Sequence, residues 1–242
     1  MNLCIDQGNT NTKIGLFDQK QLIRSIILET INMVSLESIL NSYPINACIY
    51  SSVGTDAIDI IEHLKNKVPF FTQLNHQTAI PITNHYQTPE TLGKDRLAAI
   101  IGASYLKPQC DTLVIDAGTA ITYDFIDAKH NYLGGNISPG IDMRLKALHA
   151  FTQKLPAVQV DKNVSFLGNN TQTALQAGAL YGILFEIDGY IASLKIKYPQ
   201  LSTFLTGGSA IYFDSKLKNT TFAETNLVLI GLNRILEYNV QK

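Results

Sequence analysis

The stretch Asp6-Gln7-Gly8-Asn9-Thr10-Asn11-Thr12-Lys13 decides the fold, because a weaker copy of it, Asp116-Ala117-Gly118-Thr119-Ala120, returns near the middle of the chain. Each aspartate follows a short apolar run, Leu3 to Ile5 in one case and Leu113 to Ile115 in the other. A glycine lets the backbone approach a phosphate, hydroxyl and amide side chains donate to its oxygens, and a carboxylate holds a cation directly or through water. The repetition predicts a duplicated, two-lobed nucleotide site.

Composition excludes several classes of protein. Apolar residues make up 45% of the 242 residues and charged residues 16%, which is typical of a well-packed globular chain. The net charge of −1 gives no basic footprint, so we expect no nucleic acid among the partners. No apolar run approaches the roughly 18 residues that span a bilayer, so we expect no membrane association. No leader segment is visible, and three widely spaced cysteines fit a reducing compartment, so we expect a cytoplasmic protein.

The order of predicted elements indicates two lobes of similar design. Strands are expected at about 2–7, 12–17 and 22–28, and again at 111–116, 120–126 and 132–137. Alternating helices and strands follow each triplet, with helices expected from Ser35, over 55–67, 97–106, 171–198 and 226–238. Pro108 ends a helix, so the lobes are expected to be 1–108, with a phosphate loop and a substrate loop, and 109–242, with the second motif. Strand hairpins followed by helix–strand alternation predict a mixed sheet flanked by helices in each lobe.

Six motifs in order resemble those of the type III pantothenate kinases, two-lobed phosphotransferases of the actin, hexokinase and acetate-kinase superfamily. The resemblance covers nearly the whole chain and implies an α/β fold with two ribonuclease H-like lobes. Each lobe would hold a mixed five-stranded sheet, with a cleft between the lobes. The motifs are Asp6-x-Gly8-Asn9-Thr10-x-x-Lys13, Tyr86-x-x-Pro89-x-x-x-Gly93-x-Asp95-Arg96, Asp116-x-Gly118-Thr119-Ala120, Gly134-Gly135-x-Ile137-x-Pro139-Gly140, Thr171-x-x-Ala174-x-x-x-Gly178-x-x-x-Gly182 and Thr206-Gly207-Gly208.

Two residues depart from the family pattern. Gln7 stands where the family usually has Ile or Val, and Thr88 stands where Asn is common. The side chain of Gln7 is expected to point away from Asp6 and Gly8, because neighbouring residues of a strand face opposite sides.

The resemblance implies a transferase that moves the γ-phosphate of ATP to pantothenate and forms 4'-phosphopantothenate, the first step of coenzyme A synthesis. Asp6 would orient magnesium directly or through its waters, and Asp116 would bind a monovalent cation, potassium or ammonium. Asp95 would be the base that accepts the substrate hydroxyl proton. The ATP-binding residues implied are Asp6, Gln7, Gly8, Asn9, Thr10, Asn11, Thr12, Lys13 and Thr119. The substrate-binding residues implied are Tyr86, Gly93, Lys94, Asp95, Arg96 and Thr171, with the last reaching the pocket of the partner in a homodimer.

Ordinary structural explanations exist for the same residues. Asp6 to Lys13 taken alone could be a plain hairpin, Asp95 an acid facing a helix dipole, and Arg96 one half of a surface ion pair. Thr171 is a good helix N-cap, and the small residues Ala174, Gly178 and Gly182 could serve packing within one chain. The rival functions are another phosphotransferase or phosphohydrolase of the superfamily, and a non-catalytic regulatory protein.

Overall fold

The computed structural model describes residues 1–161 and 163–241, which form two compact units. The first unit contains residues 1–109, 126–134 and 226–242, and the second contains 110–125 and 135–225. The lobe boundary between residues 108 and 109 stays a prediction.

The first sheet has the strand order β3-β2-β1-β4-β5. β1 pairs antiparallel with β2, and β2 pairs antiparallel with β3, whereas β4 is parallel to β1 and β5 is parallel to β4. This is the mixed sheet that two hairpins followed by helix–strand alternation predict. Its strands are β1 (Asn2–Gln7), β2 (Thr12–Asp18), β3 (Gln21–Leu28), β4 (Ala47–Ser52) and β5 (Phe70–Gln73).

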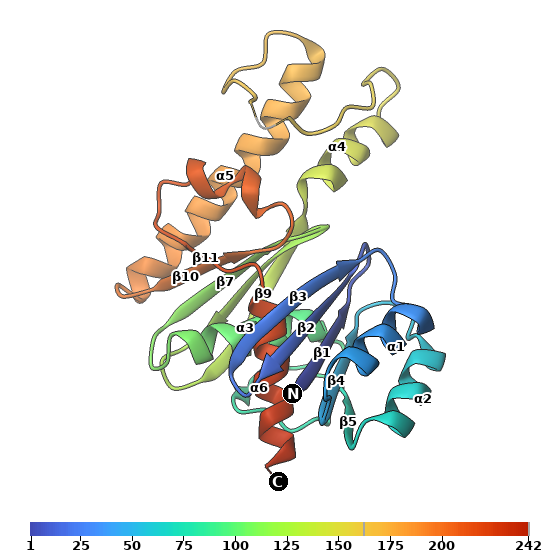
Figure 1. The fold of residues 1–242 in the computed structure, drawn as a ribbon. Coiled ribbons are helices and arrows are strands. Elements are labelled where there is room, and N and C mark those ends of the chain that lie inside the picture. The colour runs from blue at the N-terminus through green and yellow to red at the C-terminus, as the bar shows by residue number, and fades with distance from the viewer. Residues whose placement is uncertain (162, 242) are drawn as a thin grey trace. The chain divides into compact units, whose positions relative to one another are not determined.

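Helices α1 (Met33–Ser42) and α2 (Ile58–Lys67) pack on one face of this sheet (Figure 1). Their buried side chains, such as Leu36 and Leu64, join Leu3 and Ile5 of β1 in one hydrophobic core. α1 begins at Met33, two residues before the predicted start at Ser35. Asn32 caps the helix and accepts from the Ser35 backbone N–H at 2.9 Å, while Ser35 closes a capping box.

Helices α3 (Lys94–Leu106) and α6 (Leu227–Val240) approach each other backbone to backbone. A Cβ on Gly231 would lie 1.8 Å from the Ala98 carbonyl oxygen, and one on Gly102 would lie 2.4 Å from that of Leu227. Glycine is therefore required at both positions, because any side chain would push the helices apart. This contact fixes α3, whose first turn carries Asp95 and Arg96.

The second sheet repeats the strand order of the first, as β9-β8-β7-β10-β11, and β6 adds a sixth strand beside β9. The five strands expected are therefore present, and the additional β6 comes from the loop before α3. The strands are β7 (Thr112–Ala117), β8 (Ala120–Ile126), β9 (Asn131–Pro139), β10 (Ser202–Thr206), β11 (Phe222–Ala223) and β6 (Thr83–Asn84).

Helices α4 (Ile141–Ala150) and α5 (Thr171–Lys197) follow β9, and two short 3-10 helices, Ala210–Tyr212 and Asp214–Lys216, follow β10. Leu180, Ile183 and Ile187 of α5 pack into one core with Leu113 and Ile115 of β7. The N-cap of α5 is Asn170, which accepts from the Thr173 backbone N–H at 3.0 Å. Thr171 is thus the first helical residue rather than the cap.

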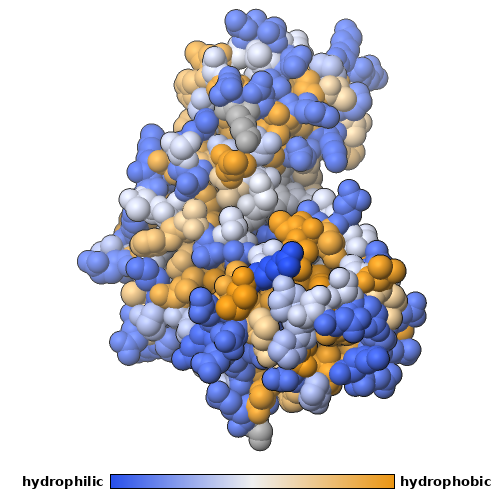
Figure 2. Space-filling model, in the orientation of Figure 1, coloured by the Kyte–Doolittle hydropathy of each residue, from blue (hydrophilic) through white to orange (hydrophobic). Residues whose placement is uncertain are grey.

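Hydrophobic side chains also reach the surface. In the region of β3 the face drawn in Figure 2 exposes hydrophobic residues among hydrophilic ones, and Ile23 and Ile27 of β3 are 50% and 62% exposed.

Cys4 and Cys48 are buried and Cys110 is partly buried, and all three are free thiols. Across the described residues, no helix is long and apolar enough to cross a membrane.

Candidate functional site

The loop between β1 and β2 carries the first motif. Its turn is closed by the Gly8 backbone N–H, which donates to the Asn11 carbonyl at 3.0 Å, while Asn9, Thr10 and Asn11 are exposed. A Cβ on Gly8 would lie 3.1 Å from that same carbonyl oxygen, so a larger residue would crowd the turn. The sequence therefore builds a tight turn whose amide and hydroxyl side chains face solvent.

Asp6 lies in the middle of a row of polar residues that crosses three strands. In the sheet register Asp6 is opposite Lys13 of β2 on one side and Ser51 of β4 on the other. Residues in register on neighbouring strands project from the same face of a sheet. Asp6 is 9% exposed and Ser51 is fully buried, so the row runs from the half-buried Lys13 into the interior. Sequence reasoning did not select Ser51.

Gln7 uses its side chain on the opposite face, as its place in the strand predicts. Its Nε2 donates to the Thr55 carbonyl at 3.0 Å, and its Oε1 accepts from the Tyr50 hydroxyl at 2.6 Å. The Tyr50 hydroxyl in turn accepts from the Ala57 backbone N–H at 3.1 Å. The amide that departs from the family pattern thus ties the end of β1 to the segment that leads into α2.

The motif that runs from Tyr86 to Arg96 gathers around the Arg96 side chain. Its guanidinium carbon lies 5.5 Å from the ring centroid of Tyr86, and its Nη2 donates to the Tyr132 hydroxyl at 3.2 Å. The rings of Tyr86 and Tyr132 are nearly parallel, 9° apart, with centroids 6.2 Å apart. The structure thus brings together Tyr86 and Arg96, and adds Tyr132, which sequence reasoning had placed only as a strand residue. Arg96 is 6% exposed, so the sequence hypothesis of a surface ion pair does not describe it.

Asp95 occupies the second position of α3, two residues after the cap Gly93. Its Oδ1 accepts from the Arg96 backbone N–H at 2.8 Å. A Cβ on Gly93 would lie 2.6 Å from this oxygen, so glycine makes room for the carboxylate. The helix begins at Lys94 rather than at the predicted Leu97, which places Lys94, Asp95 and Arg96 in its first turn. An acid in that turn interacts favourably with the helix dipole.

The motif from Asp116 to Ala120 forms the turn between β7 and β8. In this turn the Gly118 backbone N–H donates to the Ala120 carbonyl at 3.0 Å. Two glycines pack against it. A Cβ on Gly207, whose φ is +92°, would lie 2.4 Å from Oδ1 of Asp116, and one on Gly140 would lie 2.3 Å from the Thr119 carbonyl oxygen. The Gly140 backbone N–H also donates to that carbonyl at 3.1 Å. The later motifs therefore shape the Asp116 to Ala120 loop.

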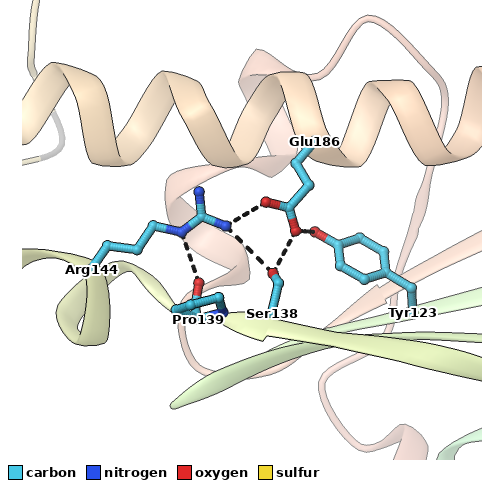
Figure 3. A network of polar contacts seen from close by, with 5 residues as sticks. All are labelled: Tyr123, Ser138, Pro139, Arg144 and Glu186. Atoms are coloured by element: carbon cyan, nitrogen blue, oxygen red, sulfur yellow. Dashed lines mark hydrogen bonds and ion pairs between the residues drawn. The ribbon is translucent and has the colours of Figure 1, made fainter. Parts of the chain in front are cut away.

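A polar network that sequence reasoning missed joins β8, β9, α4 and α5 (Figure 3). Glu186 of α5 accepts from the Tyr123 hydroxyl at 2.9 Å, from the Ser138 hydroxyl and from the Arg144 guanidinium, whose Nε donates to the Pro139 carbonyl at 2.8 Å. Burial acts to raise the pKa of Glu186, but these hydrogen bonds and the charge of Arg144 hold it below its ordinary value. Burial, and then the bond to Glu186, raise the pKa of Tyr123. No spacing rule connects these four residues in the sequence.

Small and aromatic side chains are exposed on α5 and on the segment before it. Thr171, Ala174 and Gly178 are exposed, and a Cβ on Gly178 would have no neighbour within 4 Å. Phe166 and Phe185, which contact each other edge to face, are 58% and 54% exposed. Packing within one chain therefore does not explain the glycine at position 178.

Cation ligands are sparse in the part of the chain that the structure describes, where no group of three or more His, Cys, Asp or Glu side chains is placed to hold a metal. Magnesium at nucleotide sites is usually held by one or two carboxylates together with phosphates and waters. Asp6, with a buried hydroxyl as its neighbour in register, fits such a site.

Known proteins resemble this chain over nearly its full length. A family model described as type III pantothenate kinase matches residues 2–193. Proteins named type III pantothenate kinase from Phocaeicola vulgatus and Bacteroides fragilis are 49% and 48% identical over 240 residues, which are 99% of this chain and 99% and 98% of theirs.

Solved structures agree on the architecture. One from Campylobacter jejuni, provisionally described as a conserved Baf family transcriptional activator, has a TM-score of 0.62 and 26% identity, and covers 99% of this chain and 100% of its own. The ROK hexokinase of Thermus thermophilus has a TM-score of 0.53 at 13% identity, covering 98% and 99%, and shows the fold alone.

Proposed function

The chain belongs to the type III pantothenate kinase family, and on this premise we propose that it transfers the γ-phosphate of ATP to the hydroxyl of pantothenate. The product is 4'-phosphopantothenate, in the first step of coenzyme A synthesis. The observation that carries the assignment is the substrate motif itself, in which Tyr86, Asp95 and Arg96 are held by α3 and by Tyr132.

ATP is assigned to the two acidic-glycine loops. Asn9, Thr10 and backbone N–H groups of the first loop donate to the β- and γ-phosphates, and Lys13 adds positive charge. Gln7, Gly8, Asn11 and Thr12 complete that loop, and Thr119 contributes from the second. The exposure of Asn9, Thr10 and Asn11 supports this assignment, because these residues lie at the surface, where a ligand can reach them.

Two cations are assigned to the two aspartates. Magnesium, held near Asp6 directly or through its waters, would supply neutralisation of the phosphate charge. Asp116 binds potassium or ammonium. The approach of Gly207 to the carboxylate of Asp116 supports this, because it shows that the fold controls the position of that group.

Asp95 accepts the proton of the pantothenate hydroxyl. The hydroxyl oxygen of pantothenate attacks the γ-phosphorus of ATP, and ADP leaves. Transfer of this kind depends chiefly on alignment and charge neutralisation, so Asp95 aligns the alcohol as well as accepting its proton. Arg96 presents a planar fork to the pantothenate carboxylate, and Tyr86 forms the adjacent wall together with Gly93 and Lys94.

The active form is a homodimer in which Thr171 reaches the substrate pocket of the partner. The exposed Gly178 and the exposed aromatic rings of Phe166 and Phe185 support an interface along α5, since no described residue comes within 4 Å of a Cβ on Gly178. The enzyme is cytoplasmic, where its nucleotide substrate and reduced thiols are found.

A coupled assay that follows ADP release tests the function. Activity is expected with ATP, magnesium, potassium and pantothenate, and not when pantothenate is replaced by a hexose. Equal activity on hexoses would favour another kinase of the superfamily. Sodium in place of potassium is expected to lower the rate, and an unchanged rate would contradict the role of Asp116.

A further inference from the structure

Ser51 is a buried side chain that the proposed catalytic machinery does not use. It lies at the end of β4, it is fully buried, and its Oγ has no hydrogen-bond partner among the described residues. A buried hydroxyl without a partner is rare and destabilises the fold, so it calls for an explanation. Ser52, the next residue, faces the other way and accepts from the Gly54 backbone N–H at 3.2 Å.

The neighbour of Ser51 in register suggests that explanation. Asp6 of β1 is directly opposite Ser51 in a parallel pair, so both side chains project from the same face. Strands lie about 4.8 Å apart, which places a serine hydroxyl within reach of the neighbouring carboxylate after rotation about one bond. A carboxylate can accept more than one hydrogen bond while it also faces a cation. A hydroxyl in this place can therefore orient the carboxylate without touching the ligand.

We propose that Ser51 is a positioning residue of the divalent-cation site, whose hydroxyl donates to the Asp6 carboxylate when the metal–nucleotide complex is bound. This inference rests on the proposed role of Asp6 at magnesium. Because Ser51 is fully buried, it acts through Asp6 rather than as a ligand of its own. The unpartnered hydroxyl of Ser51 lowers the stability of the ligand-free protein, and in the complex the same hydroxyl fixes the orientation of the Asp6 carboxylate.

Thr203 of β10 provides a matched control. It too is a buried residue, 1% exposed, whose hydroxyl has no partner among the described residues, but its partner in register on β7 is Leu113 rather than an acid. Removing either hydroxyl should stabilise the ligand-free protein and raise its Tm by about 2–4 °C. Only the hydroxyl of Ser51 should affect binding of the cation.

The test measures Mn²⁺ binding by electron paramagnetic resonance in the presence of a non-hydrolysable ATP analogue. Ser51→Ala is expected to weaken Mn²⁺ binding about 10- to 100-fold, the size of one hydrogen bond to a charged group. Ser51→Thr, which keeps a hydroxyl, should bind as the unaltered protein does, and so should Thr203→Val. Ser51→Cys, with a thiol of similar size and a weak donor, serves if the alanine variant does not fold, and should also bind more weakly.

Unchanged Mn²⁺ affinity in Ser51→Ala or Ser51→Cys, alongside normal binding by the unaltered protein, would overturn the role of Ser51 and leave the kinase function intact. Absence of Mn²⁺ binding by the unaltered protein would instead mean that Asp6 holds no divalent cation. This result would also overturn the inference about Ser51. Equal weakening by Thr203→Val would mean that the effect is one of packing.

Discussion

At the scale of single residues, the substrate motif shows why each position has the residue it has. Gly93 is small because the carboxylate of Asp95 lies where its Cβ would be. Asp95 is held by the backbone N–H that follows it, and the buried guanidinium of Arg96 lies over the Tyr86 ring and donates to the Tyr132 hydroxyl. Each side chain is therefore fixed before any substrate arrives, which reduces the entropy lost on binding.

Asp95→Asn should lower kcat by about 100-fold or more, the usual contribution of a positioned acid–base group, with little change in KM. Asparagine is also acceptable in the first turn of a helix, so the fold should persist, as circular dichroism would show. A kcat within twofold of the original would mean that Asp95 serves only the helix.

Arg96→Lys should raise the KM for pantothenate by about 10- to 100-fold, because lysine lacks the planar fork. The KM for ATP should change much less. Arg24→Lys is the matched control, since Arg24 also donates to a tyrosine hydroxyl, that of Tyr43 at 2.9 Å, but lies on the exposed strand β3. Equal effects on the two KM values would contradict the assignment of Arg96 to pantothenate.

At the scale of elements, close packing and one polar network hold the site-bearing segments. The contact of α3 with α6 through Gly102 and Gly231 positions the first turn of α3. The network around Glu186 ties the Ser138–Pro139 end of β9 to α4 and α5, next to Gly140, which contacts the Asp116 to Ala120 loop. Neither the α3–α6 contact nor the Glu186 network contains a residue that is assigned to a ligand. Both nevertheless hold in place the segments that carry such residues.

Gly231→Ala should destabilise the protein by roughly 1–3 kcal/mol or more, because the new methyl group meets the Ala98 carbonyl. Urea unfolding would measure the loss. Gly189→Ala on α5 is the control, since its Cβ would have no neighbour within 4 Å and should stabilise the helix by up to about 1 kcal/mol. Similar results for the two variants would contradict the close helix contact.

Stability should depend on Glu186 at low pH. Its pKa is lowered in the folded state, so its contribution is present above the unfolded pKa of about 4.3 and is lost as the pH falls through the folded pKa. Glu186→Gln should therefore cost roughly 1–3 kcal/mol near pH 7 and progressively less below about pH 4. Urea unfolding at several pH values, with the exposed Glu62→Gln as control, would test this. A cost that stays constant down to pH 3 would contradict it.

At the scale of the whole molecule, the strand order of one sheet is repeated in the other, so one architectural plan is used twice. The loops after β1 and β7 correspond in the two plans, as the repeated motif predicted. What differs is the surroundings. The first loop adjoins a cross-strand row of Lys13, Asp6 and Ser51, whereas the second is packed by Gly140 and Gly207.

Gly178→Glu should convert the proposed dimer to a monomer without unfolding the chain, because the position is exposed and a Cβ there meets no described residue within 4 Å. Light scattering would report the mass, and the KM for pantothenate should rise if Thr171 of the partner lines the pocket. The exposed Ser38→Glu on α1 is the control. A dimer that survives Gly178→Glu would place the interface elsewhere.

The sequence by itself determined the elements and the family. Apolar alternation and turn residues predicted strands β1, β2 and β7 to within a residue or two, because these signals are local. The helix starts were less accurate, since Asn32, Asn170 and Gly93 begin helices where serine, threonine or a later position was expected. Several residues can each satisfy the first N–H groups of a helix, and local pattern does not choose among them.

Only the tertiary structure decided which distant residues meet. Tyr132 against Tyr86, Ser51 beside Asp6, and Glu186 with Arg144 are pairs with no signal in spacing, because strand register and helix docking depend on burial across the whole fold. Sequence motifs contain the residues that the chemistry requires, so those residues could be predicted from the sequence. The groups that hold them in place are chosen by packing, which acts between segments far apart in the chain.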